Sequence, residues 1–164
     1  MLNVQRRLLL TAVAAAPLLT ACGFHLRQTP DFGFARIALA MPVTSLAVEL
    51  RRQLEGTGRI EVVTDPARAE VVLESVGEQR QRSVVSRAAT GEVREVQLRI
   101  RLTFRLRTVD GRELLADSEI LRQIDQSYSE SAALSKETEA LMLYQNMQSD
   151  IVQQVLRRLA TIKP

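Results

Sequence analysis

The stretch VQLRIRLTFRLR, residues 96–107, alternates apolar and polar side chains without a break. A period of two over this length is typical of an antiparallel β-strand with one buried face and one open face. The apolar face consists of Val96, Leu98, Ile100, Leu102, Phe104 and Leu106. The opposite face carries Arg99, Arg101, Arg105 and Arg107. We therefore expect a long strand that buries its apolar side in a core and leaves a row of arginines open.

The residues that follow predict a hairpin. Residues 109–111 have the composition of a three-residue loop whose glycine takes the left-handed conformation, and a return strand begins at Glu113. This register places Arg107 opposite Glu113 and Arg101 opposite Glu119, so that opposite charges pair across the strands.

Further elements flank this hairpin. The patterns predict a strand at 35–41, a helix with apolar positions Leu46, Leu50 and Leu54 and a cap at Thr44 or Ser45, a strand start at 60–64, a long and bulged strand over 70–87, and a helix over about 134–159. The last helix has the stripe Leu141, Tyr144, Gln148, Ile151, Val152, Val155 and Leu159. The order β-α-β-β-β-α predicts an α+β fold, a two-layer sandwich in which two helices cover one face of an about four-stranded mixed or antiparallel sheet.

The start of the chain has the pattern of a bacterial lipoprotein signal. Arg6 and Arg7 precede a short apolar run over residues 8–19, and the motif Leu19-Thr20-Ala21-Cys22 lies at the end of this run. We expect cleavage after residue 21, a lipid on Cys22, a lead-in over 22–34 and one domain over 35–164. The apolar run has 12 residues, whereas a membrane-spanning helix needs about 20. The two arginines also permit twin-arginine export, so the choice between that route and the general secretory route stays open.

The lipid prediction sets the expected location. Gly23 follows the cysteine where an aspartate would hold a lipoprotein in the inner membrane, so we expect the outer membrane, with the domain on its periplasmic side. The chain without residues 1–21 has 20 basic and 19 acidic side chains, which gives no reason to expect a nucleic-acid partner. Cys22 is the sole cysteine, so no disulfide can form within the chain.

The sequence argues against catalysis. Its one histidine, His25, lies three residues from the lipid site, so a hydrolytic triad in the domain has no base. Ser135 and Lys136 are adjacent on a predicted helix and face different ways, so we do not expect them to form a catalytic Ser-Lys dyad. There is no His/Cys cluster with metal-ligand spacing and no glycine-rich phosphate loop. We expect no enzymatic activity, no metal and no cofactor.

The arginine face of residues 97–107 permits two interpretations. It is either a solvated face with cross-strand salt bridges or a docking face for an acidic or phosphorylated partner, since the planar guanidinium suits carboxylate and phosphate. Arg80, Arg82 and Arg87 lie on the neighbouring strand or its turn and would extend such a patch.

Three motifs resemble the LptE family of lipopolysaccharide-assembly lipoproteins. They are Cys22-Gly23-Phe24-His25-Leu26-Arg27, the turn into a strand at 91–98 (GEVREVQL), and the C-terminal helix with 133–139 (ALSKETE), 147–150 (MQSD) and 156–159 (LRRL). Their order and spacing cover nearly all of the chain after residue 21.

This resemblance implies a function. The domain would plug the lumen of the outer-membrane β-barrel LptD, support its assembly and help deliver lipopolysaccharide to the cell surface. Family members bind lipopolysaccharide through basic residues that match Arg87 and Lys136 here, with Arg94 as a substitute for Arg87. The resemblance also makes Arg99, Arg101, Arg105 and Arg107 candidates for contact with the barrel.

Two other functions stay open from the residues alone. One is a pilot or lipid-binding lipoprotein of another envelope transport machine, and the other is an envelope hydrolase.

Overall fold

The alternating stretch lies within β4 (Val93–Thr108), the middle strand of a long antiparallel blade between β3 (Val71–Arg87) and β5 (Glu113–Ser127). The computed structural model describes residues 31–163. All six apolar side chains of the stretch are buried, which confirms the predicted faces. They form the centre of the main hydrophobic core.

A short β–α unit completes the sheet. β1 (Arg36–Ala40) pairs in parallel with β2 (Glu61–Val63) and with the first four residues of β3. α2 (Ser45–Glu55) joins β1 to β2, and the 3₁₀ turn η2 (Pro66–Arg68) leads into β3. The sheet is mixed, with the order β2-β1-β3-β4-β5. The α+β fold class is confirmed, and the three-residue β2 brings the sheet from about four strands to five.

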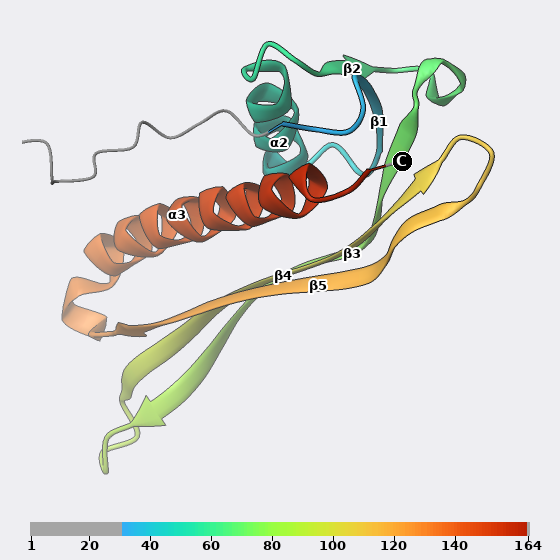
Figure 1. The fold of residues 1–164 in the computed structure, drawn as a ribbon. Helices are drawn as coiled ribbons and strands as arrows, with labels where there is room; N and C mark the ends of the chain where they lie inside the picture. The colour runs from blue at the N-terminus through green and yellow to red at the C-terminus, as the bar shows by residue number, and fades with distance from the viewer. Residues whose placement is uncertain (1–30, 164) are drawn as a thin grey trace, which may run out of the picture.

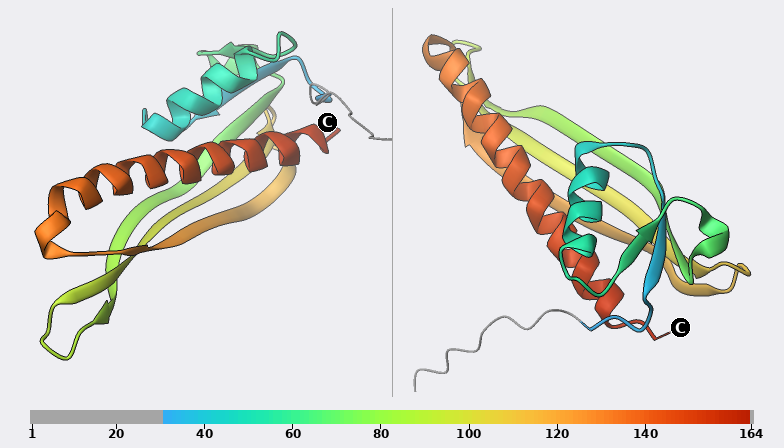
Figure 2. Two further views of the ribbon diagram at one scale, coloured as in Figure 1. Left: turned by 90° about the vertical axis from the view of Figure 1, so that its left-hand side faces the viewer. Right: turned by 90° about the horizontal axis from the view of Figure 1, so that it is seen from above.

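The two helices of residues 31–163 lie on one face of the sheet (Figures 1 and 2). α3 (Ala133–Ala160) follows the 3₁₀ turn η3 (Glu130–Ala132) and runs along the blade. α2 lies beside the C-terminal half of α3. The hydroxyl of Thr44 accepts a hydrogen bond from the Ala47 N–H at 3.3 Å, which is the predicted helix cap.

The predicted stripe of α3 is correct in its C-terminal half and wrong at Leu141. Tyr144, Ile151, Val152, Val155 and Leu159 are buried, whereas the Leu141 side chain is 59% exposed. Ala140 and Met147 are buried in its place. The reason is that α2 covers α3 only from about Gln148 onward, so the same side of the helix is open nearer its N-terminus.

The predicted hairpin loop is confirmed. The N–H of Thr108 donates to the carbonyl of Arg112 at 2.9 Å, which encloses residues 109–111, and Gly111 has a φ of 93°. Arg107 lies opposite Glu113 as expected.

The predicted register fails farther from the loop. Two irregularities between Phe104 and Arg107 each add one residue to β5, so Arg101 lies opposite Leu121 instead of Glu119. The cause is the pair Leu114-Leu115, because a regular strand would turn one of the two away from the core and the bulges let both pack against it. A slip of two residues keeps every side chain on its predicted face.

Different turns and helix ends lie at the two ends of the molecule. We call the end with the β3–β4 turn, η3 and the start of α3 the distal end, and the end with the β4–β5 turn the basal end (Figure 1). The Asp31 carboxylate accepts from Arg59 at 3.0 Å, near the start of β1 and thus at the basal end. The predicted signal peptide, Cys22 and the first part of the predicted lead-in, up to residue 30, lie outside the described residues.

Candidate functional site

The three basic residues expected to bind lipopolysaccharide all lie at the distal end. Arg87 ends β3 and pairs with Val93 across the hairpin. Its guanidinium donates to the carbonyl of Gly91 at 3.1 Å and so braces the turn, in which Gly91 has a φ of 91°. Arg87 has no ion pair within residues 31–163.

Lys136 lies in the first turn of α3 and is held by the protein. Its ammonium donates to the hydroxyl of Ser127 at 3.1 Å and to the carboxylate of Glu139 at 2.8 Å. The hydrogen bond from Lys136 is the main reason that the pKa of Glu139 lies below its usual value. Gln126, which is 2% exposed, donates from its amide to the carbonyl of Lys136 at 2.9 Å. Lys136 therefore fastens α3 to the end of β5.

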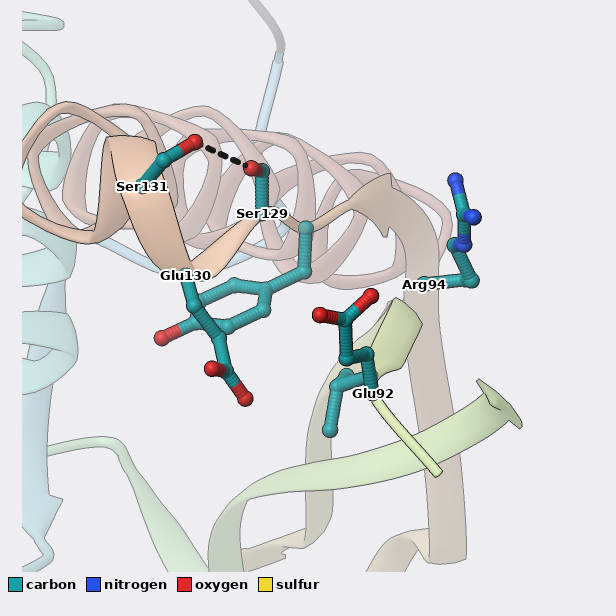
Figure 3. A pocket seen from close by; sticks show the side chains of 7 residues that line it. Glu92, Arg94, Ser129, Glu130 and Ser131 are labelled. Carbon is teal, nitrogen blue, oxygen red and sulfur yellow. Dashed lines mark hydrogen bonds between the residues drawn. The ribbon is translucent and has the colours of Figure 1, made fainter. Parts of the chain in front are cut away.

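Arg94 lies at the mouth of a hollow of about 280 Å³. The lining comes from the start of β4 and the β5–α3 connection, and consists of Glu92, Val93, Arg94, Tyr128, Ser129, Glu130 and Ser131. In Figure 3 the carboxylates of Glu92 and Glu130 border the hollow, and the guanidinium of Arg94 extends away from both. The hollow itself is acidic, so an anion can meet Arg94 only from its outer side.

The structure brings these three residues to neighbouring positions without a shared pocket. Arg87 pairs with Val93, the next residue is Arg94, and the Arg94 carbonyl accepts from the Tyr128 N–H at 2.8 Å. Lys136 bonds to Ser127, next to Tyr128. Of the three, only Arg94 lines the hollow.

The prediction that Arg80 and Arg82 extend the outer arginine face is wrong. They lie opposite Ile100 and Leu98, whose side chains are buried under the helices, so they project to the helix side of β3. The Val76 bulge in β3 sets this orientation. Arg82 forms an ion pair with Glu137 of α3 and lies 5.3 Å from the centre of the Tyr128 ring.

Sequence reasoning missed this use of the two tyrosines. Arg80 stacks on Tyr144, with 3.6 Å between its guanidinium carbon and the ring centre. The signal was present in the sequence, because Tyr128 and Tyr144 are its only tyrosines. The pairing of these tyrosines with arginines could be inferred only from the strand register, which places Arg80 and Arg82 under α3.

The outer sheet face carries the other four predicted arginines. Arg105 and Arg107 both donate to the carboxylate of Glu74, at 2.6 and 2.5 Å. These two hydrogen bonds hold the pKa of Glu74 below its usual value. Arg101 lies 3.5 Å from Glu119, so the expected ion pair forms diagonally despite the shifted register.

Arg99 differs from its three neighbours. Its guanidinium donates to the side-chain oxygen of Gln97 at 2.6 Å and has no acidic partner in the described part of the chain. The outer face is thus charge-balanced toward the basal end and keeps a free cation at Arg99.

The model of the family "LptE: Lipopolysaccharide-assembly" matches residues 34–159, from just before β1 to the end of α3. The chain belongs to the LptE family. The family resemblance seen in the sequence is therefore confirmed.

Two relatives in this family are named LPS-assembly lipoprotein LptE. The protein of Yersinia enterocolitica is 28% identical over 97% of this chain and 78% of its own length. The protein of Photorhabdus laumondii is 26% identical over 97% of this chain and 88% of its own length.

Solved structures share the LptE-family fold. The solution structure of an uncharacterized lipoprotein B from Nitrosomonas europaea has a TM-score of 0.74 and 31% identity, over 84% of this chain and 90% of that chain. The crystal structure of the rare lipoprotein B from Shewanella oneidensis has a TM-score of 0.66 over 77% and 94% of the two chains, at 22% identity.

Family membership decides the class of the protein. LptE proteins are non-enzymatic lipoproteins of lipopolysaccharide assembly, which confirms the prediction that this chain is not an enzyme. It also implies a lipid-anchored protein of the cell envelope. Within residues 31–163 no group of three or more His, Cys, Asp or Glu side chains has the geometry of a metal site, and no helix there has the length and apolar character needed to cross a membrane.

Proposed function

We propose that this protein is the lipoprotein subunit of the lipopolysaccharide translocon. Its domain would occupy the lumen of an LptD-type β-barrel, support the assembly of that barrel and help pass lipopolysaccharide to the cell surface. Acylated Cys22 would hold it on the periplasmic side of the outer membrane. The observation that carries the proposal is the family match over residues 34–159, together with relatives named for lipopolysaccharide assembly.

The outer sheet face supports the barrel contact. Large outer-membrane barrels have a polar interior, and the outer face of β4 presents arginine, threonine and glutamine side chains with their acidic partners. A mostly neutral, hydrogen-bonding face suits a wet, polar wall better than a row of free cations would. Arg99 is the arginine of this face whose charge is not balanced by an acidic partner among residues 31–163.

The three basic residues at the distal end differ in how free their side chains are to bind a lipid phosphate. Arg94 and Arg87 have guanidinium donors free of acidic partners, and the planar fork of arginine suits the phosphates of lipid A. Lys136 would have to give up Ser127 and Glu139 to bind a phosphate. We therefore propose Arg94 and Arg87 as the main contacts and Lys136 as a weaker one.

The test is to isolate the acylated protein from native outer membranes in mild detergent and to identify its partner. A stoichiometric large β-barrel of the translocon is the expected result. A different envelope machine as the partner would favour the pilot or lipid-binding function instead. Recovery of the protein alone would count against both.

A further inference from the structure

The two long strands at the sides of the blade differ in what lies next to them. β5 forms one edge and is tied to α3, because Arg158 donates to the backbone carbonyl of Glu119 at 3.2 Å. β3 becomes the other edge where its pairing with β1 ends, at Glu74 (Figure 1). Residues 77–84 pair regularly with β4 and have no strand of residues 31–163 on their other side. Such an edge can pair with a strand of another molecule.

The helix side of this free edge carries one acidic and one basic side chain without a charged partner. Glu78 and Arg80 both project to this side, since they lie opposite buried residues of β4. Glu78 accepts from the Thr44 hydroxyl at 2.8 Å and forms no ion pair in the described part of the chain. Arg80 contacts the Tyr144 ring and also lacks an acidic partner there. Arg82, the next residue on this side, is compensated by its ion pair with α3.

The order of these two charges makes the edge complementary to itself. If two copies pair antiparallel about Gln79, Glu78 of each copy lies opposite Arg80 of the other. Residues directly opposite one another project to the same face, so both Glu–Arg pairs form on the helix side. Thr44 holds the carboxylate toward the free edge, because it follows β1, the strand on that side of β3. An axis one residue later would place Arg80 opposite itself, which is unfavourable.

Exposed apolar side chains coincide in this arrangement. Val43, which is 94% exposed, precedes the threonine that bonds to Glu78 and therefore lies at the level of Glu78. Leu141 is also exposed and lies about one helical turn before Tyr144, which contacts Arg80. Because Glu78 of one copy meets Arg80 of the other, Val43 of each copy comes to the level of the other copy's Leu141.

Bulges limit the length of the contact. The register of β3 shifts at Val76 and at Val85, so its regular stretch begins at Gly77. A pairing that is symmetric about Gln79 and begins at Gly77 in one copy ends at Gln81 in the other. This range stops short of β1, whose last paired residue lies opposite residue 74. The interface is thus small, and small interfaces are typical of weak, reversible association.

We propose that residues 77–81 of β3 join two copies of this chain edge to edge in a weak two-fold dimer. Backbone hydrogen bonds between the edges provide affinity, and the two Glu78–Arg80 pairs fix the register. The dimer is a form of the protein on its own, so the proposal depends neither on the barrel nor on lipopolysaccharide.

A disulfide on the two-fold axis tests the register. Gln79→Cys is introduced into the acylated full chain, in which Cys22 carries the lipid and is the sole natural cysteine. The protein is oxidised mildly in detergent, with empty micelles in large excess so that two chains seldom share one by chance. The Gln79→Cys variant should form a covalent dimer on the order of tenfold faster than either control, because a disulfide needs Cα atoms within about 7 Å.

The two controls lie on the same outer face of the sheet. Ser83→Cys is on the same edge, but in this register the two cysteines of a dimer are about 26 Å apart. Gln123→Cys is an exposed position of β5, at the opposite edge. Cross-linking of either control as fast as Gln79→Cys would overturn the proposed register, and no cross-link at Gln79→Cys would overturn the dimer.

Charge variants test the Glu78–Arg80 pairs without a cross-link. Glu78→Arg places two arginines opposite each other and should weaken the dimer about fivefold in sedimentation velocity experiments, because both pairs of the symmetric contact are lost. Combining Glu78→Arg with Arg80→Glu restores opposite charges in the same register and should recover the affinity. Dimerisation that Glu78→Arg leaves unchanged would overturn the charge pairing. Since Arg80 also contacts Tyr144, the single Glu78 variant decides the matter if the double variant does not fold.

Discussion

The guanidinium carbon of Arg80 lies 3.6 Å from the centre of the Tyr144 ring, and the hydroxyl of the same tyrosine donates to the backbone carbonyl of Gln81 at 2.6 Å. A single side chain of α3 thus binds two consecutive residues of β3, in the stretch that pairs with β4 but no longer with β1. These contacts lie beyond the reach of α2, so they help to hold the distal half of α3 on the blade.

The first prediction concerns this tyrosine. Tyr144→Phe keeps the ring over Arg80 but removes the hydrogen bond to Gln81, and should lower the free energy of unfolding by about 1 kcal/mol. Tyr144→Leu also removes the cation–π contact and should cost about 0.5–1 kcal/mol more. Urea denaturation measures both. The matched control is Tyr128→Phe, which keeps its ring beside Arg82 and should be neutral. Equal losses for the two phenylalanine variants would contradict this assignment.

The second prediction is a pH dependence at Glu74. Its side chain is 17% exposed and accepts hydrogen bonds from Arg105 and Arg107, which lower its pKa in the folded state. A lowered folded-state pKa stabilises the fold above the unfolded-state pKa of about 4.3, and this stabilisation is lost as the pH falls through the folded value. Because both arginines are partly exposed, Glu74→Gln should cost only about 1 kcal/mol at pH 7.

The measurement for Glu74 is urea denaturation of both proteins at pH 7 and at pH 3. The difference between wild type and Glu74→Gln should be smaller at pH 3 than at pH 7. A constant difference across this range would mean that the ion pairs with the two arginines contribute nothing to stability.

The third prediction concerns two basic residues at the distal end: Lys136, which is bonded to other side chains of the protein, and Arg94, which has no acidic partner in the described part of the chain. Lys136→Gln removes the bonds to Ser127 and Glu139 and should cost about 0.5–1 kcal/mol of stability. Arg94→Gln should leave stability within about 0.5 kcal/mol of wild type. If Arg94 is the main lipid contact, its variant should nevertheless lose more binding of fluorescent lipopolysaccharide than the Lys136 variant.

A charge variant in the hollow provides the control for this pair. Glu92→Gln removes a negative charge near Arg94 and should strengthen binding of the anionic lipid. Unchanged binding in both the Arg94 and Glu92 variants would mean that Arg94 is not the lipid contact.

The sequence was most informative where a pattern depends on a single strand or turn and not on its neighbours in the fold. The alternation at 96–107 predicted both faces of β4, since period two is a property of the strand itself. The loop at 109–111 was equally local, because Gly111 supplies the positive φ that the turn needs. Both predictions are confirmed.

The predictions failed where packing against other elements of the fold determines the register of a strand or the exposure of a side chain. The register of β5 depends on bulges that let Leu114 and Leu115 both reach the core, and no local pattern fixes where a bulge falls. Leu141 is exposed because α2 starts too late along α3 to cover it. The side on which Arg80 and Arg82 project depends on the bulge at Val76. Local patterns also do not reveal side-chain partners such as Glu139 for Lys136, and these partners determine whether a basic residue is free to bind a ligand.

The last prediction tests the outer sheet face against the proposed barrel. Arg99 has no acidic partner, whereas Arg105 shares Glu74 with Arg107. If this face meets an acidic part of the barrel wall, Arg99→Glu should lower the amount of barrel recovered with the protein, because a free cation contributes more to a complementary interface than a compensated one. Arg52→Glu, a charge reversal on exposed α2, is the control and should leave recovery unchanged. Equal losses for the two variants would indicate a general charge effect, and a loss for Arg52→Glu alone would place the barrel contact on the helix side of the domain.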